Sequence, residues 1–514
     1  MPSKDESNTF SYQARLNLDG PSAIMLDACA ELLSRLERKL FADICKGKVP
    51  GDVKAEYIRK YGITARQFNA LRVQIEGKMR SIRERRPGLI AETKDKIASA
   101  QKDVARRQKR EPGSEKLHHK KRRLVSLKHR LETLQAEQAT GKVSLCFGSK
   151  RLFRAQFALN ENDYQSHAQW LADWRRSRNN SFFLLGSKDE SSGNQSCTAT
   201  ITEDGSIRLR LRLPPAVAGQ EKYLWLPPIH FTYGHENIVA ALRSCEDRKL
   251  LQASKSPEAI HYGVALSYRF VRDEKGWRVF VSLPVQKPKT VTSQHKGVIG
   301  VDINANHLAL TETDRFGNPI AKKSIPLNTY GKSRNQIRAV VGDACAAIVE
   351  AARSVGKPLV IEQLNFQKKK AELKDHASPA LARMLSSLAY SSIISGLNSR
   401  AWRLGVEVME VNPAYTSIIG RVKFAKRYGL SVHHAAALVI ARRHLRASER
   451  VPRHLDSIPD GKGSHVALSP PVRNRDKHVW HAWGIINRSF KTVLAAHFRV
   501  KKYRSSSSKP ACVI

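Results

Sequence analysis

The chain has few acidic residues for its size, and this shortage indicates the kind of partner that it binds. Its 514 residues include 46 Asp and Glu but 89 Lys and Arg, which gives a formal net charge of +43. Such an excess of one sign would drive a compact chain apart unless a polyanion neutralised it. Nucleic acid fits best, because basic side chains release condensed counterions when they contact phosphates.

Paired cysteines and long apolar runs are also absent from the sequence. The seven cysteines are odd in number and include no Cys-x-x-Cys pair, which argues against a disulfide framework and against a zinc site. No apolar run is long enough to span a bilayer, and the first residues lack the layout of a signal peptide. We therefore expect reduced thiols, no zinc, no membrane partner and a cytoplasmic location.

The first 290 residues combine a helical segment with a β-rich one. Residues 1–20 contain one short strand, residues 21–140 are expected to form a basic helical domain, and residues 141–290 hold alternating runs typical of strands. Hairpin signals such as Asp204-Gly205 separate these runs, so we expect a β-rich module that resembles a small barrel. Pro112-Gly113 predicts a turn between two long helices that pack as an antiparallel hairpin.

Basic residues crowd the helical segment in clusters of one sign. A single cluster is most often a solvated helix face, but several in one helical block favour a nucleic-acid-binding surface. Three lysines farther along the chain could serve the same purpose or form a solvated loop. The residues predicted to contact nucleic acid are Lys78, Arg80, Arg83, Arg85, Arg86, Arg106, Arg107, Lys109, Arg110, Lys120, Lys121, Arg122, Arg123, Lys368, Lys369 and Lys370.

From about residue 297 to residue 500 the pattern becomes that of an α/β domain, and residues 501–514 are expected to be a disordered tail. Asp302 ends the apolar run GVIGVD, and Glu362 follows the apolar run LVI. A single carboxylate of this kind usually caps a turn, but a buried one is costly unless it is paired or binds a cation. Two of them, each ending a buried strand, predict a Mg²⁺ or Mn²⁺ site that holds one or two ions.

Three segments of this domain resemble the RuvC motifs of the transposon-associated TnpB proteins and of the type V CRISPR effectors. They are GVDINANHLALTETDRFGN, VIEQLNF and VNPAYTSIIGRVKFAKRYGLSVHHAAALVIARR, in that order. The resemblance implies a multidomain α+β protein with an N-terminal helical recognition lobe, a β-rich wedge and a C-terminal RNase H-like (RuvC) domain. It also implies a guide RNA, target double-stranded DNA, catalytic Asp302 and Glu362 with Mg²⁺, and a prokaryotic, nucleoid-associated protein.

The chain departs from this pattern in two places. The cysteines of a zinc ribbon are missing after Thr416 and Ser417, and aligning Ala435-Ala436-Ala437 with the Asn-Ala-Ala of the family puts His433 at the third catalytic Asp. Imidazole brings no negative charge and suits Mg²⁺ poorly. His433 could instead be an ordinary histidine at a helix end. The residues that could then supply the acid from the following loop are Asp456, Asp460 and Asp476.

These observations favour an RNA-guided DNA-binding effector whose RuvC-type site is weakened for cleavage. The compact type V-M effectors resemble the chain most in length class and in ribbon loss, and that group is associated with silencing without efficient cutting. One alternative is a fully active RNA-guided endonuclease. A further one is a guide-independent RuvC-like nuclease, which would need little of the first 290 residues. A basic protein without chemistry would leave Asp302 and Glu362 unexplained.

Overall fold

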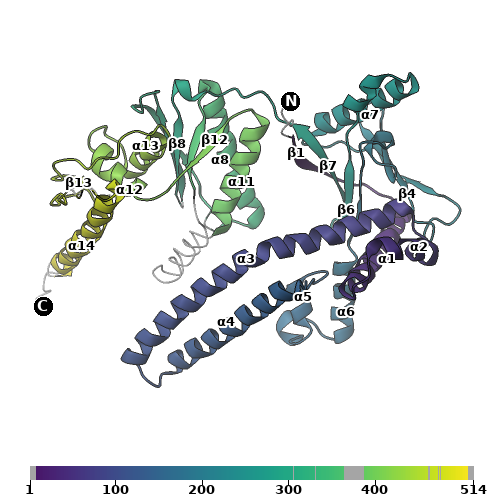
Figure 1. The fold of residues 1–514 in the computed structure, drawn as a ribbon, viewed down its shortest axis with the longest axis horizontal. Helices are drawn as coiled ribbons and strands as arrows, with labels where there is room; N and C mark the ends of the chain where they lie inside the picture. The colour runs from purple at the N-terminus through teal and green to yellow at the C-terminus, as the bar shows by residue number, and fades with distance from the viewer. Residues whose placement is uncertain are drawn as a thin grey trace, which may run out of the picture. The chain divides into compact units, whose positions relative to one another are not determined.

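The computed structural model describes residues 7–304, 306–329, 331–363, 387–460, 464–472, 474 and 476–506 (Figure 1). The chain divides into two compact units, Met1–Gln286 and Lys287–Ile514, each with sheets and a core of its own. Within the described ranges, none of the helices carries an apolar stretch of the length that a bilayer crossing requires.

The first unit contains two open antiparallel sheets. The larger has the strand order β1-β7-β6-β2, and the smaller has the order β3-β4-β5. The expectation that this module resembles a barrel is therefore wrong, because neither sheet closes on itself. The strand β5 has only three residues, and Pro227 and Pro228 follow it without backbone N–H donors to extend the pairing. The strands are β1 (Ser7–Arg15), β2 (Ser181–Leu184), β3 (Cys197–Ile201), β4 (Ile207–Arg212), β5 (Tyr223–Trp225), β6 (Ser267–Asp273) and β7 (Gly276–Gln286).

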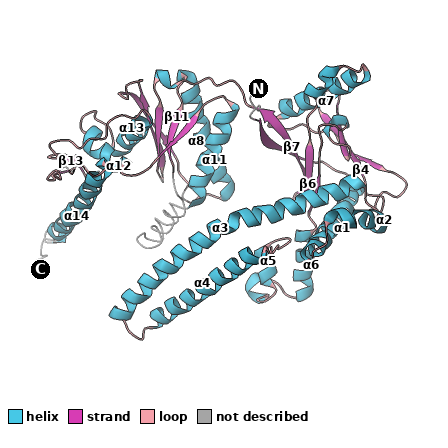
Figure 2. Ribbon diagram, in the orientation of Figure 1, coloured by secondary structure: helices cyan, strands magenta, loops and turns pink. Residues whose placement is uncertain are grey.

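The helices of the first unit include the expected hairpin, formed by α3 and α4 (Figure 2). Thr64 and Gln67 begin α3 with a reciprocal capping box, and Ser114 caps α4. At 46 residues, α3 is about 69 Å long. The α-helices are α1 (Gly20–Cys45), α2 (Pro50–Tyr61), α3 (Ala65–Arg110), α4 (Glu115–Thr140), α5 (Lys150–Ala155), α6 (His167–Arg178) and α7 (His235–Ala253). Short 3₁₀ turns cover Asn160–Asn162, Ser191–Gly193 and Pro257–His261.

The second unit is built on a five-stranded sheet of order β10-β9-β8-β11-β12. The first three of these strands form an antiparallel meander, whereas β11 runs parallel to both β8 and β12. Parallel neighbours need crossover connections, and the helices α8 and α11 supply them. The strands are β8 (Ile299–Ile303), β9 (His307–Thr313), β10 (Pro319–Pro326), β11 (Leu359–Glu362) and β12 (Val408–Val411).

Helices cover both faces of this sheet (Figure 2). On one face, Val301 and Ile361 belong to the core that α8 (Arg334–Val355) and α11 (Ser387–Arg403) complete. On the other face, Val360 packs with residues of α13 (Val432–His444). Side chains alternate along a strand, so the even-numbered residues of β8 and β11 point toward α13.

A third group of elements follows the sheet. It contains α12 (Thr416–Gly420), a π-helical turn (Arg421–Ala425), β13 (Ile458–Pro459), β14 (His465–Val466) and α14 (Val479–Ser506). Before the sheet, the chain forms a 3₁₀ turn (Gln294–Lys296). The segment where the resembling proteins carry a zinc ribbon is helical here, and Ile419 and Phe424 pack there with fully buried Trp483. Because α14 runs to Ser506, it includes the start of the predicted tail, and residues 507–514 lie outside the described residues.

Candidate functional site

Asp302 and Glu362 lie at the carboxyl ends of two neighbouring parallel strands. The register pairs Leu359 with Ile299 and Ile361 with Val301, so the next residues along the two strands are Glu362 and Asp302. Both are even-numbered and therefore share the face that α13 covers. The carboxyl ends of parallel strands are where open α/β sheets bind their ligands. The two sequence-predicted acids are thus on adjacent strands, at one edge and on one face.

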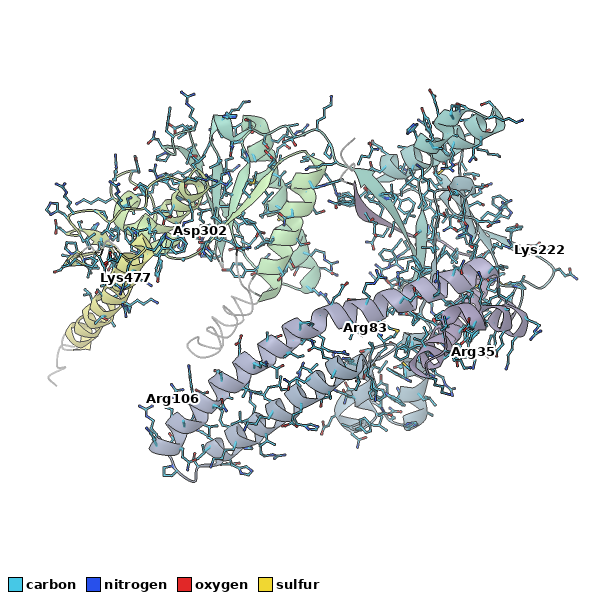
Figure 3. The ribbon with its side chains drawn as sticks, viewed as in Figure 1. Arg35, Arg83, Arg106, Lys222, Asp302 and Lys477 are labelled. Atoms are coloured by element: carbon cyan, nitrogen blue, oxygen red, sulfur yellow. The ribbon has the colours of Figure 1, made fainter. Side chains whose placement is uncertain are left out.

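The carboxylate of Asp302 is nearly buried and has two polar neighbours at one oxygen. Its side chain is 11% exposed. The side-chain amide of Asn304 donates to Oδ2 at 2.9 Å, and Nδ1 of His433 lies 3.2 Å from the same oxygen. Figure 3 labels Asp302. These contacts provide the compensation that a buried carboxylate needs.

His433 reaches Asp302 because α13 lies directly on β8. Gly300, two residues before Asp302, allows this approach: a Cβ atom there would lie 2.0 Å from the carbonyl oxygen of Ala437. Ser431 begins the helix, and its Oγ accepts a hydrogen bond from the backbone N–H of His434 at 3.2 Å. The first turn of α13 is thereby fixed at the carboxyl end of β8, with His433 beside the acid.

The neighbouring His434 has a different environment. Its Nδ1 lies 2.7 Å from Oγ of Ser431, and its Nε2 lies 3.1 Å from Oγ of Ser324 on β10. Burial lowers the pKa of His434 below its ordinary value of 6.5. His434 therefore fastens α13 to β10, and of the two histidines only His433 contacts the acidic site.

Three residues near the site were not found from the sequence. The ring of His307 meets that of His433 edge-on, with 4.8 Å between centroids, and burial followed by the His433 charge lowers the pKa of His307. Tyr390 donates to the carbonyl of Ile303 at 3.2 Å, and burial, with the charges of Asp302 and Glu362, raises its pKa to about 12. Asn304 and His307 lie within the first of the three motifs, so their place in the sequence was the available signal.

Glu362 is held from the other side of the site. The hydroxyl of Thr416, the first residue of α12, donates to Oε1 of Glu362. Thr416 is 2% exposed, so this partner is itself fixed by packing. Among the loop acids weighed as substitutes, Asp460 is buried and accepts from the backbone N–H of Ser464 at 3.0 Å, while Asp456 is exposed beside His454.

The donor set does not fit a centre for two divalent ions. Asp302, Glu362 and His433 supply two carboxylates and one imidazole, whereas a pair of hard cations needs several bridging and terminal oxygens. Across the residues that the structure describes, no three His, Cys, Asp or Glu side chains are grouped as ligands around one point. An imidazole donor is in general better suited to Mn²⁺ than to Mg²⁺.

The predicted basic contacts fall into three groups. Eight of them, on α3 and α4, have exposed side chains that form no ion pair within the described residues (Figure 3 labels one of them, Arg83). Others are engaged in ion pairs: Lys78 lies 2.5 Å from Glu37, and Arg106 and Lys120 both bind Asp103. Lys368, Lys369 and Lys370 lie outside the described residues. The eight exposed side chains without an ion pair are Arg80, Arg83, Arg85, Lys109, Arg110, Lys121, Arg122 and Arg123, and Arg106 is exposed as well but pairs with Asp103.

For Arg86, the predicted contact with nucleic acid is wrong. This arginine is 3% exposed, and its guanidinium donates to the carbonyls of Glu137 and Lys142 at 2.7 and 2.5 Å and pairs with the Glu137 carboxylate. Phosphates cannot reach a guanidinium enclosed in this way. Arg86 instead ties the end of α4 to the middle of α3.

Replacing Arg122 and Arg123 together with Gln is expected to weaken nucleic-acid binding through charge alone. The plot of log affinity against log salt has a negative slope. For every phosphate that the variant no longer neutralises, the magnitude of this slope should decrease by about 0.7 for single strands and about 0.9 for duplex DNA. Arg86→Gln should instead lower the free energy of unfolding by about 1–3 kcal/mol, because buried carbonyls lose their donors. Salt titrations and thermal melting measure the two effects. An unchanged slope in the double variant would show that Arg122 and Arg123 do not contact phosphates.

Fold and site together define a protein of mixed helix-and-sheet class, with paired acids at the carboxyl ends of parallel strands. No protein-family model and no curated protein sequence matches the chain. Solved structures similar to the chain include the following three. The first is Cas12f1 in complex with sgRNA and target DNA, at 10% identity and a TM-score of 0.35, covering 85% of this chain and 99% of that one.

The second is RuvC of Thermus thermophilus, at 17% identity and a TM-score of 0.22, covering 29% of this chain and 92% of that one. The third is Cas12i in complex with crRNA and double-stranded DNA, at 10% identity and a TM-score of 0.27, covering 65% of this chain and 53% of that one. Two of these three structures are Cas12 proteins in complex with RNA and DNA, and one is RuvC. Their TM-scores lie below 0.5, so the case for a function rests on the motifs and on the site.

Proposed function

We propose that this chain is an RNA-guided DNA-binding effector whose RuvC-type site is weakened for cleavage. The second unit serves as its RNase H-like domain, with Asp302 and Glu362 as the two acids that remain of the catalytic set. Three motifs in the expected order support this assignment, and so does the register that brings both acids to one edge of the sheet. Guide RNA selects the DNA sequence by pairing, and the protein binds the shape of the heteroduplex.

The contact between His433 and Asp302 carries the proposal. A carboxylate at this position would add negative charge for a divalent cation, whereas His433 adds none. Its Nδ1 also lies 3.2 Å from Oδ2 of Asp302, beside one of the oxygens that would bind the ion. Both features weaken metal binding, and cleavage of the phosphodiester depends on the metal.

The charge of the first unit supports the guided part of the proposal. Several exposed arginines and lysines lie on α3 and α4, and the whole chain carries a formal charge of +43. This charge supplies affinity without sequence preference, since contacts to phosphates hold the backbone but do not identify bases. Sequence choice must then come from another component, and a guide RNA provides it through base pairing.

The proposal is tested by purifying the full chain from a host that also transcribes its native locus and sequencing the RNA that remains bound. We expect one structured RNA, and retention of duplex DNA that matches its guide segment. A duplex of the same length with a scrambled target strand is the control, because it preserves the phosphate contacts. Absence of a bound structured RNA, or equal retention of both duplexes, would refute guided binding.

A fully active RNA-guided endonuclease is the second candidate. The observation that favours it is the preserved pair of acids, Asp302 and Glu362, held on adjacent strands with partners that fix their side chains. The two candidates share the same guide and the same DNA and differ only in the rate of cutting; in the second, either His433 or an acid from the following loop completes the site.

A further inference from the structure

One face of the smaller sheet of the first unit is rich in arginine, with Arg208 exposed and Arg210 and Arg212 half-buried. Along β4, Arg208, Arg210 and Arg212 alternate with three buried aliphatic residues, Ile207, Leu209 and Leu211. The aliphatic side chains belong to the core, so the arginines share the opposite face. Within the part of the chain that the structure describes, none of the three arginines forms an ion pair. They are therefore available to an anion from solution.

Two aromatic rings lie among these arginines. The strand register places Trp225 opposite Arg210 and Tyr223 opposite Arg212. The Arg210 guanidinium lies 4.6 Å from the centroid of Tyr223 and 5.6 Å from that of Trp225, and its Nε donates to Thr198 at 3.2 Å. The hydroxyl and the two rings orient Arg210, and its cation–π contacts stabilise the rings in place.

The rings remain open to solvent despite these contacts. Trp225 is 53% exposed and Tyr223 is 37% exposed. Exposed aromatic rings beside unpaired guanidinium groups are the combination that binds unstacked nucleobases and their phosphates. A double helix would not offer its base faces to them, so the arrangement favours a single strand.

A hollow of about 410 Å³ adjoins Trp225 and supplies polar groups of a different kind. Arg208, Asn17, Asp19 and Ser22 line it, with an apolar part formed by Leu226, Pro227 and Pro228. Oδ1 of Asp19 accepts from the backbone N–H of Ser22 at 2.9 Å, which leaves the carboxylate with further lone pairs. A carboxylate that lines the same hollow as an exposed aromatic ring can accept from a ribose hydroxyl, as acidic residues do in dinucleotide sites.

We propose that this face binds an unpaired segment of RNA. One base stacks on Trp225, the adjacent phosphates contact Arg208 and Arg212, and a 2′-hydroxyl donates to Asp19. The 2′-hydroxyl separates RNA from DNA at such a site. The inference rests on the proposed function only where it identifies this RNA as a single-stranded part of the guide.

Photocrosslinking on the unaltered full chain tests the placement directly. After bound RNA is removed in high salt, the probe is a short single-stranded uridine RNA carrying one 4-thiouridine, with the 2′-deoxy oligonucleotide of the same sequence as a second arm. We expect crosslinks on the peptide that contains Tyr223 and Trp225, with the DNA arm reduced at least about fivefold. Crosslinks confined to other peptides would overturn the proposal, and so would equal yields from RNA and DNA.

Variants measure the stacking contribution. Trp225→Ala should weaken the affinity for the same RNA at least about fivefold, also in high salt, because base stacking does not depend on screening. Phe316→Ala is the matched control: Phe316 is 66% exposed and carries Arg315 4.6 Å above its ring, but it lies outside this face. An equal loss in both variants would overturn the assignment.

Failure of this inference is distinguishable from failure of the proposed function. Retention of guide-matched DNA without crosslinks at Trp225 would refute only this surface. Crosslinks at Trp225 without guide-dependent DNA retention would refute only the proposed function.

Discussion

Replacing His433 with Asp is expected to raise Mg²⁺-dependent cleavage of guide-matched DNA at least about tenfold, which corresponds to about 1.4 kcal/mol of barrier. The new carboxylate would stand at the first turn of α13, next to Asp302, where Nδ1 of His433 now lies 3.2 Å from Oδ2. It adds an oxygen ligand and a negative charge, both of which hard cations prefer. Product formation over time, with the same guide and duplex, measures the effect.

His434→Asp is the matched control for this gain. It introduces the same charge one residue along the helix, but the side chain of His434 contacts Ser431 and Ser324 rather than Asp302. Cleavage should not rise in this variant. A similar gain in both variants would show that any added negative charge at the start of α13 raises cleavage, whatever its position. No gain in His433→Asp would refute the position assigned to His433.

Gly300→Ala is expected to separate α13 from the sheet and to remove both stability and site geometry. The added Cβ would meet the carbonyl oxygen of Ala437 at 2.0 Å, and a backbone atom in a packed helix cannot rotate aside. Overpacking of this kind costs about 1–3 kcal/mol and sometimes more. Thermal melting of the full chain should show the unit from Lys287 onward unfolding earlier, and the His433→Asp gain should vanish when the two changes are combined.

Gly342→Ala provides the comparison within the same unit. Gly342 lies inside α8, where a Cβ would have no neighbour within 4 Å. Ala is the better helix former, so this variant should be more stable by up to about 1 kcal/mol. Equal effects from the two substitutions would contradict the close packing of α13 on β8.

The acids of the site could be predicted because their signal is local. A carboxylate that ends an apolar run is visible in the sequence at Asp302 and at Glu362. Their shared edge and face depend on the strand order and register, which the structure supplies. His433 was predicted through the alanines that follow it. Asn304 was missed because its contact with Asp302 depends on the backbone just after β8, which a sequence pattern does not fix.

The errors have physical reasons of the same kind. Alternation predicted strands in residues 141–290 but could not predict closure, which requires the ends of a sheet to pair. Charge clustering identified the basic helices, but it could not tell which residue of a cluster faces the partner helix. Arg86 faces α4 and is enclosed, whereas Arg85 is exposed. The sequence did not predict a binding role for Tyr223 and Trp225, because their position opposite Arg212 and Arg210 depends on the strand register.

The most direct test of the central claim measures binding and cutting on the same guide-matched duplex, in Mg²⁺ and in Mn²⁺, for the unaltered chain and for Asp302→Ala. We predict tight, guide-dependent binding by both proteins, with cleavage by the unaltered chain slow in Mg²⁺ and faster in Mn²⁺. Rapid Mg²⁺-dependent cleavage that Asp302→Ala abolishes would contradict the claim of a weakened site.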